Sequence, residues 1–309
     1  RPLCAACQLA KQTRIGSTAT TGRHNPEVTG HLSRDNLQPG DRVSIDQYMS
    51  ALPGRLPHTK GKEAKNKRYV GGTIFVDHAT QIIWLAHQVS LRTGETLKSK
   101  NSFERFSAIN GWKVKEYLAD NHPFHSEAFL NDLNKKNQEI SYCGVGAHHQ
   151  NAKAERAIRT TTQWARAMLL HATIHWPEQA HLELWPFAME QAIYLWNNMP
   201  HKRNRLAPIE LFTQTKFSDY RHLQRAHAWG CPVYVLDPTA QDGKKLPRWQ
   251  KRSRRGVYVG VSPKHSSTVG RVLNTETGYI SPQYHVVYDD LFSTVSNPLG
   301  TDFTGETFS

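Results

Sequence analysis

The chain has 309 residues, of which 38% are hydrophobic and 10% aromatic, so it can bury a core and global disorder is excluded. A formal net charge of +13 predicts a polyanionic partner, and nucleic acid is the default candidate. A merely basic or ribosome-associated protein is the alternative. No apolar run approaches the roughly 20 residues of a membrane span, so no membrane partner is expected. Only four cysteines at this length favour a reducing, intracellular setting over a disulfide framework.

Both ends of the sequence look like interior points of a longer polypeptide. The chain begins without an initiator methionine and ends on the trailing stretch "NPLGTDFTGETFS". Residues 16–40 are rich in Ser, Thr, Gly, Asn and Pro, which is typical of a linker. We therefore expect a segment of a larger protein, with a linker near its start.

The linker is followed by alternating strand and helix patterns. Residues 41–49 predict a strand with Val43 and Ile45 on one face and Ser44 and Asp46 on the other. Two apolar runs joined by a short turn, 69–77 and 81–89, predict an antiparallel hairpin. Further along we expect a helix over 95–109, a strand over 114–120, a helix over 126–136, a strand over 139–145, a long helix from Asn151 and a buried helix within 181–200. This order predicts a mixed sheet with helices on both faces.

The last third of the chain has a different pattern. Short β segments at 231–237, 255–262, 270–280 and 283–290, separated by Gly and Pro turns, predict a small barrel or sheet module. Basic residues gather at 60–68 and again at 244–255, where seven of them surround Trp249. We divide the chain into an N-terminal segment and linker (1–36), a mixed-sheet core (37–200), a helical connector (201–230), a β module (231–292) and a tail (293–309).

Three acids carry the candidate chemistry. Asp46 lies in the first predicted strand, Asp120 ends the fourth, and Glu155 lies in the first turn of the long helix. A mixed sheet can bring such positions to one point, where carboxylates bind Mg²⁺ or Mn²⁺. Two ions about 3.5–4 Å apart would serve phosphoryl transfer, and would also relieve the mutual repulsion of the acids. The alternative for Glu155 is a surface ion pair with Arg159 at i+4.

Three stretches resemble the catalytic blocks of integrases from copia-type LTR retrotransposons. They are "SIDQY", "ADN" and "HHQNAKAERAIRTTTQWARAML", and 34 residues separate Asp120 from Glu155. The resemblance continues in order through the flanking stretches "CAACQLAKQTR", "WPFAMEQAIYLWNNMP", "APIELF" and "HLQRAHAWGCPVYV" to "HVVYDD". The family belongs to the retroviral integrase superfamily, whose core is ribonuclease H-like.

This resemblance implies a fold and an activity. The fold is α/β, a ribonuclease H-like mixed five-stranded sheet with helices on both faces and a small SH3-like β module. Asp46, Asp120 and Glu155 would be the catalytic residues of a polynucleotidyl transferase and would hold two Mg²⁺ or Mn²⁺ ions. The reaction is strand transfer, in which a 3′-hydroxyl of retrotransposon cDNA attacks a target phosphodiester. Expected partners are double-stranded DNA and further copies of the chain, in the nucleus after a cytoplasmic stage.

Other residues are candidates for contacting DNA. They are Asn121, Gln150, Asn151, Lys153 and Arg159 near the acids, and Lys244, Lys245, Arg248, Trp249, Lys251, Arg252, Arg254 and Arg255 in the second basic cluster. Two positions depart from the family pattern, since His122 and Ala152 stand where it has glycine. They motivate the alternative of a catalytically decayed nucleic-acid-binding remnant. A different ribonuclease H-like nuclease is a further alternative.

Cys4 and Cys7 form one CxxC pair, which resembles the second half of the family's His-His-Cys-Cys zinc module. A tetrahedral zinc site needs four ligands. We therefore expect zinc only if two histidines lie upstream of residue 1.

Overall fold

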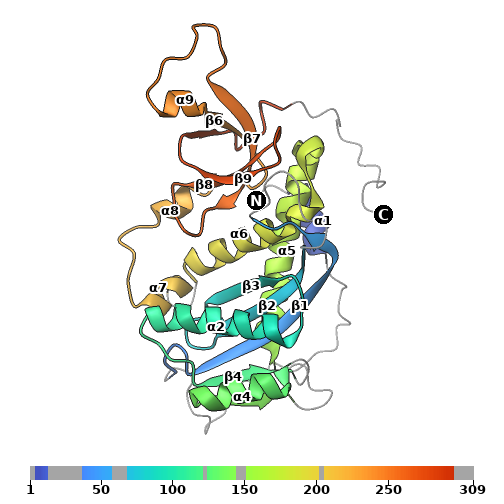
Figure 1. Ribbon diagram of the computed structural model, residues 1–309, viewed down its shortest axis with the longest axis vertical. Coiled ribbons are helices and arrows are strands. Elements are labelled where there is room, and N and C mark those ends of the chain that lie inside the picture. The colour runs from blue at the N-terminus through green and yellow to red at the C-terminus, as the bar shows by residue number, and fades with distance from the viewer. Residues whose placement is uncertain are drawn as a thin grey trace.

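A mixed five-stranded sheet forms the centre of the protein. The computed structural model describes residues 4–12, 37–57, 68–120, 124–143, 151–201 and 205–295. The strands are β1 (Arg42–Gly54), β2 (Tyr69–Asp77), β3 (Ile83–Gln88), β4 (Glu116–Ala119) and β5 (Glu139–Tyr142). Their order is β3-β2-β1-β4-β5, with β1, β2 and β3 antiparallel and with β4 and β5 parallel to β1 (Figure 1). This arrangement confirms the predicted ribonuclease H-like sheet.

Helices cover both faces of this sheet, as predicted. The helices α2 (Thr93–Ile109) and α4 (Glu127–Lys136) pack on one face, where Phe75, Phe103 and Phe129 meet. The helices α5 (Ala152–His175) and α6 (Trp185–Asn198) pack on the other. Val43 and Ile45 of β1 are fully buried under the first pair, as their alternation predicted. Asp46 pairs with Ile74, a residue that packs against α5, so Asp46 belongs to the α5 face.

Strand β1 extends five residues beyond the end that the alternation pattern predicted, because it runs on to Gly54. Contacts from distant residues hold this extension. The Trp185 indole donates to the Leu52 carbonyl at 2.9 Å, and the Arg55 amide donates to the Glu183 carbonyl at 2.8 Å. A Cβ on Gly54 would lie 2.5 Å from Pro186, so a glycine is required where the strand meets α6.

A second, antiparallel sheet forms the C-terminal β module. Its strands are β6 (Pro232–Leu236), β7 (Ser253–Val261), β8 (Gly270–Asn274), β9 (Ile280–Gln283) and β10 (Val286–Tyr288), in the order β10-β6-β7-β8-β9. The sheet is compatible with the predicted SH3-like module. The segment predicted over 270–280 is split by a turn, in which Gly278 takes a φ of +72°. The module lies at the opposite end of the molecule from β4 and α4 (Figure 1).

One hydrophobic cluster joins this module to the core. Leu169 and Ala172 near the end of α5 pack with Phe187 and Ala188 of α6 and with Val233 and Val257 of the module, among others. The helix predicted within 181–200 is in fact the 3₁₀ turn η4 (Leu182–Leu184) followed by α6. Pro186 in the first turn of α6 sets this start, because its missing N–H would have no partner there.

Short helices complete the described chain. They are α1 (Ala5–Lys11), η3 (Pro177–Gln179), α7 (Pro208–Thr213), α8 (Arg221–Gln224) and α9 (Pro238–Gln241). The helix α1 packs on α5 through Ala6, Ala10 and Leu170. Within the described ranges, no helix combines the length and the apolar character that crossing a membrane would require.

A buried lysine ties α2 to α4. Lys100 is 0% exposed, and its Nζ donates to Asp132 at 2.6 Å and to Gln138 at 2.7 Å. It also lies 2.7 Å from the carboxylate of Glu104. A buried cation is tolerated only when it is paired and hydrogen-bonded in this way.

We predict that Lys100→Ala lowers the free energy of unfolding by about 3 kcal/mol, because Gln138 loses its donor and two carboxylates lose a cation. Urea denaturation measures this change. Lys98→Ala is the matched control on the same helix, since its exposed pair with Glu95 contributes less than about 1 kcal/mol. If both variants lost the same free energy of unfolding, the stabilising role of the buried Lys100 contacts would be refuted.

Candidate active site

Asp46 lies in β1, and Asp120 directly follows the neighbouring parallel strand β4. Ser44 of β1 pairs with Leu118 of β4, and continuing this register by two residues would set Asp46 opposite Asp120. Residues paired in this way point to the same face, and neighbouring strands lie about 4.8 Å apart. The two carboxylates therefore share the α5 face of the sheet. Both side chains are half-buried.

Cys143 lies within electrostatic range of all three predicted acids. Ala119 pairs with Tyr142 across β4 and β5, and the Cys143 amide donates to the Ala119 carbonyl at 3.1 Å, so Cys143 stands beside Asp120. Burial raises the pKa of the Cys143 thiol, and the negative charges of Asp120, Glu155 and Asp46 raise it further. The three acids, from β1, the end of β4 and α5, therefore lie in the same region of the fold.

Asn151 fixes where α5 begins. It is the N-cap residue of the helix, it is 2% exposed, and its amide nitrogen donates to the Ile45 carbonyl at 2.9 Å. Ile45 directly precedes Asp46, so this bond holds the first turn of α5, with Glu155, against the strand that carries Asp46. Asn151 was predicted to contact DNA, but in this structure its buried amide holds the helix start instead.

The donor chemistry of the three acids suits Mg²⁺ or Mn²⁺, because carboxylate oxygens are the hard ligands that these ions prefer. In the described part of the chain, however, no three His, Cys, Asp or Glu side chains are grouped closely enough to hold a metal ion. One Asp46 oxygen accepts the Gln47 amide at 2.8 Å. Carboxylates repel one another when no cation lies between them, which favours such a spread arrangement.

The remaining candidates near the acids have different surroundings. Glu155 and Arg159, both within the described α5, form no ion pair, so the surface-pair interpretation of Glu155 finds no support. Arg159 is exposed. Lys153 Nζ lies 3.5 Å from the His78 carbonyl. Asn121 and Gln150 lie outside the described residues, as does His122.

The second basic cluster divides into two parts. Lys244, Lys245, Arg248, Lys251 and Arg252 are exposed in the segment between α9 and β7, together with Trp249. Arg254 and Arg255 belong to β7 itself. The Arg255 guanidinium lies over the Trp176 ring at 5.4 Å, and burial lowers the pKa of Arg254. These two arginines therefore make contacts within the protein that the sequence pattern did not indicate.

Cys4 and Cys7 lie at the start of α1, beside α5. Their side chains hydrogen-bond to each other; the backbone hydrogen bond from Cys7 lowers the pKa of Cys4, and burial raises that of Cys7. Their surroundings include Trp164, Met168 and His171, but no described group of three ligands forms there. The pair by itself does not fit a zinc ion.

A chain of polar contacts runs from β1 to the β module. The Tyr48 hydroxyl lies 2.6 Å from Nδ1 of His87, and Nε2 of His87 lies 3.6 Å from Glu190. Glu190 in turn pairs with Arg271 of β8, a residue that is 8% exposed and whose guanidinium lies over the Phe187 ring. Burial lowers the pKa of His87. No sequence pattern indicated this link, since its members are far apart in the chain.

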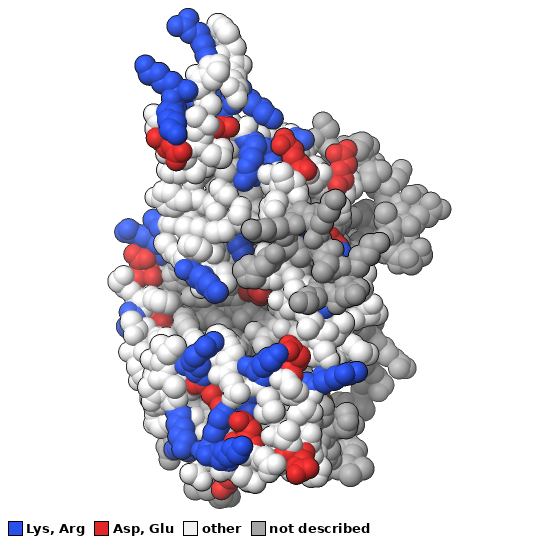
Figure 2. Space-filling model, viewed as in Figure 1, with Lys and Arg blue, Asp and Glu red and all other residues white. Residues whose placement is uncertain are grey.

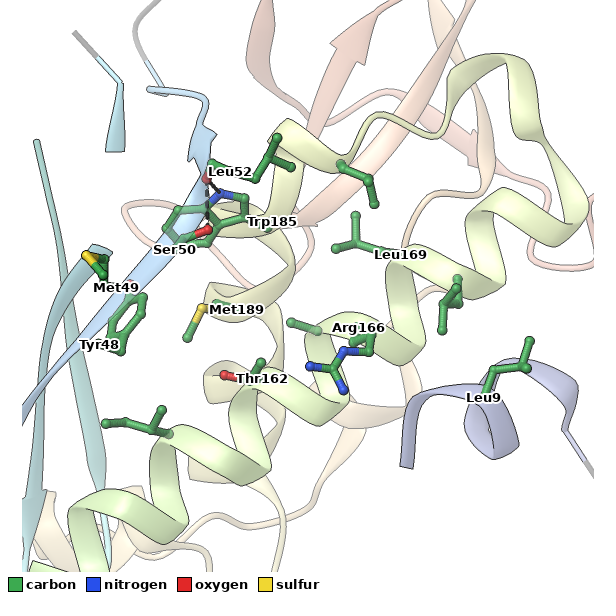
Figure 3. Close-up of a pocket in the computed structure, with 14 residues that line it drawn as sticks. Leu9, Tyr48, Met49, Ser50, Leu52, Thr162, Arg166, Leu169, Trp185 and Met189 are labelled. Atoms are coloured by element: carbon green, nitrogen blue, oxygen red, sulfur yellow. Dashed lines mark hydrogen bonds between the residues drawn. The ribbon is translucent and has the colours of Figure 1, made fainter. Parts of the chain in front are cut away.

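An apolar pocket of about 760 Å³ lies beside the candidate site, between β1, α5, α6 and α1. Figure 3 shows Tyr48, Met49 and Leu52 on the β1 side and Thr162, Arg166 and Leu169 on α5. The strand β1, which carries Asp46, and the helix α5, which carries Glu155, thus also line this pocket. Its lining is almost entirely apolar, so the pocket and the acidic site have different chemistry.

The strand order and directions are those of a ribonuclease H-like core, the type that the motifs predicted. No family model matches the chain. Over 305 residues, 96% of its length, the chain is 29% identical to the retrovirus-related Pol polyprotein from transposon RE1 of Arabidopsis thaliana. It spans 18% of that polyprotein. This similarity to a transposon Pol polyprotein agrees with the resemblance that the motifs indicated.

Two solved structures are similar at lower identity. One is the HTLV-2 integrase catalytic core domain in complex with magnesium, in its trimeric form, which is 15% identical in sequence. The match covers 57% of this chain and 98% of that chain, with a TM-score of 0.39. The other is the simian T-cell lymphotropic virus intasome in complex with PP2A regulatory subunit B56 gamma, which is 14% identical in sequence. The match covers 85% of this chain and 84% of that chain, with a TM-score of 0.43.

We predict that Asn151→Ala destabilises the protein by about 1–3 kcal/mol, because the buried Ile45 carbonyl loses its donor. Chemical denaturation measures this change. Asn198→Ala is the control, since that amide donates only along its own helix, to Tyr194. The proposed anchoring role requires the Asn151 variant to lose clearly more stability than the control.

Proposed function

We propose that the chain is the integrase region of an LTR-retrotransposon polyprotein and joins cDNA ends to target DNA. The observation that carries this proposal is the placement of Asp46 on the α5 face of the sheet, where the Asn151 bond to Ile45 also holds the first turn of α5 with Glu155, while the negative charges of Asp120, Glu155 and Asp46 all act on Cys143. Similarity to a transposon Pol polyprotein over 96% of the chain supports it independently. The reaction class is polynucleotidyl transfer, in which a DNA 3′-hydroxyl attacks a target phosphodiester.

The three carboxylates would hold the metal ions that this reaction class uses. Asp46 lies in β1 and Asp120 directly follows the adjacent strand β4, so both would bind the ions from the sheet. Glu155 would close the site from α5, at a position fixed by the Asn151 bond to Ile45. Bound Mg²⁺ or Mn²⁺ ions, two per site in this proposal, would supply charge neutralisation of the phosphate and of the attacking and leaving oxygens.

DNA would be held by cations outside the acidic site. Five exposed Lys and Arg residues between α9 and β7 suit phosphate contacts, which are sequence-neutral and salt-dependent. Arg159 and Lys153 lie near Glu155 on α5 and would contact the DNA close to the reacting bond. Joining two cDNA ends to one target calls for several copies of the chain. The site of action would be the nucleus, after a cytoplasmic stage.

A catalytically decayed DNA-binding remnant is the second candidate. One observation favours it: among the described residues, no three potential ligands are grouped closely enough to hold a metal ion. Such a remnant would keep the basic surface and bind DNA without transferring strands.

We predict that Asp120→Asn lowers strand transfer by at least about 100-fold in Mg²⁺, because one of the carboxylates that would hold the metal ions is lost. DNA binding should persist, since removing a negative charge does not weaken phosphate contacts. Joining of a labelled DNA end to plasmid measures the activity. Asp219→Asn, on the exposed connector, is the control. Equal activity in the two variants would refute the triad, and inactivity of the unchanged chain would favour the remnant.

Lys251→Ala tests the basic surface. We predict a uniform loss of affinity across DNA sequences and a decrease of about 1 in the slope of log K against log salt, because one phosphate contact is removed. Titrations at several salt concentrations measure the slope. Lys98→Ala, exposed on α2, should leave it unchanged. An unchanged slope for Lys251→Ala would exclude this residue from the DNA contact.

A further inference from the structure

Trp249 occupies the apex of a tight turn on the β module. The Gln250 amide donates to the Pro247 carbonyl at 3.1 Å, which closes a four-residue turn with Arg248 and Trp249 at its two central positions. The Trp249 side chain is 92% exposed, more than any other large hydrophobic side chain in the described chain. In that part of the molecule it has no ring, cation or hydrogen-bond partner. The fold therefore displays this indole without using it for packing.

The segment that presents Trp249 is tied at its base. The Asp237 amide donates to the Arg252 carbonyl at 2.8 Å, and the Lys244 amide donates to the Thr239 carbonyl at 3.1 Å. These bonds join the two ends of the loop from Lys244 to Arg252, which extends from the module beside α9 (Figure 1). The position of the ring is thus constrained before any ligand arrives, which lowers the entropy cost of binding.

Cations surround the exposed ring. Lys244, Lys245, Arg248, Lys251 and Arg252 are all exposed, and Lys and Arg side chains project from this end of the molecule (Figure 2). The acidic neighbours Asp242 and Glu276 make only long, solvent-exposed pairs with Lys244 and Lys251, at 3.9 Å and 3.6 Å. Such pairs contribute little, so the cations stay available to an anionic ligand.

We propose that this loop binds unpaired DNA bases by stacking on Trp249 while the neighbouring cations contact the phosphates of the same strand. This inference deepens the proposed function and rests on its assignment of DNA as the ligand. Stacking requires a free base face, which an unpaired nucleotide offers and the interior of a duplex does not. An aromatic side chain beside cations provides both contacts that single-stranded nucleic acid needs. The loop would therefore prefer DNA with frayed ends or overhangs to a blunt duplex.

Fluorescence anisotropy with two labelled DNAs tests the proposal: a blunt duplex, and the same duplex with a short single-stranded overhang. Binding is measured in EDTA, so the result does not depend on catalysis. Trp249→Ala should weaken binding to the overhang DNA by about 10-fold and leave the blunt duplex unchanged. Trp249→Phe should retain most of the affinity, because it keeps a stacking face. Lys251→Ala should weaken both DNAs alike.

The outcomes separate this inference from the proposed function. If Trp249→Ala weakens neither DNA, or weakens both equally, base stacking is refuted, and an apolar contact to a protein partner becomes the better explanation of the exposed ring. If the unchanged chain binds neither DNA, both proposals lose their ligand. If Asp120→Asn keeps strand-transfer activity while the overhang preference depends on Trp249, the triad fails and the stacking inference stands. Thermal unfolding of the Trp249 variants should match the unchanged chain, because the ring packs on nothing.

Discussion

The pairing of β1 along both of its edges is the constraint on which the candidate site depends. Antiparallel pairing with β2 sets Asp46 opposite Ile74, and parallel pairing with β4 sets Ser44 opposite Leu118, two residues before Asp46 and Asp120. A shift of one residue in either register would turn Asp46 to the other face of the sheet, into the cluster around Phe75 and Phe103. Burial of Val43 and Ile45 on that face opposes such a shift, because it would expose both side chains.

The helix α5 joins the acidic site to the β module. Its first turn carries Glu155 and is held to β1 by the Asn151 bond, while Leu169 and Ala172 near its end pack in the cluster shared with the module. A second connection runs from Tyr48 through His87 and Glu190 to Arg271. Two separate sets of contacts therefore link the module to the strand that carries Asp46. The module is a structural part of the core and not an independent appendage.

The sequence predicted most elements, and its errors have identifiable causes. The alternation of Val43, Ser44, Ile45 and Asp46 is a local property, so the sequence alone predicted the strand and the face on which each side chain lies. The extension of β1 to Gly54 could not be predicted in this way, because it depends on hydrogen bonds from the region of Glu183 and Trp185. The segments at 181–200 and 270–280 were each predicted as one element, and a proline in the first case and a turn in the second divide them.

For the candidate site, the identities of the three acids came from the sequence, through the motifs that resemble integrase blocks. Composition also determined the net positive charge of the chain, because the sum of the side-chain charges does not depend on the fold. The tertiary structure alone decided which side chains meet: it set Asp46 beside Asp120, buried Asn151 as an anchor and placed Arg255 over Trp176. It also left the Trp249 side chain exposed, on a loop whose backbone is hydrogen-bonded at its base. These outcomes depend on strand register and on contacts between residues that are distant in the chain, which no local pattern encodes.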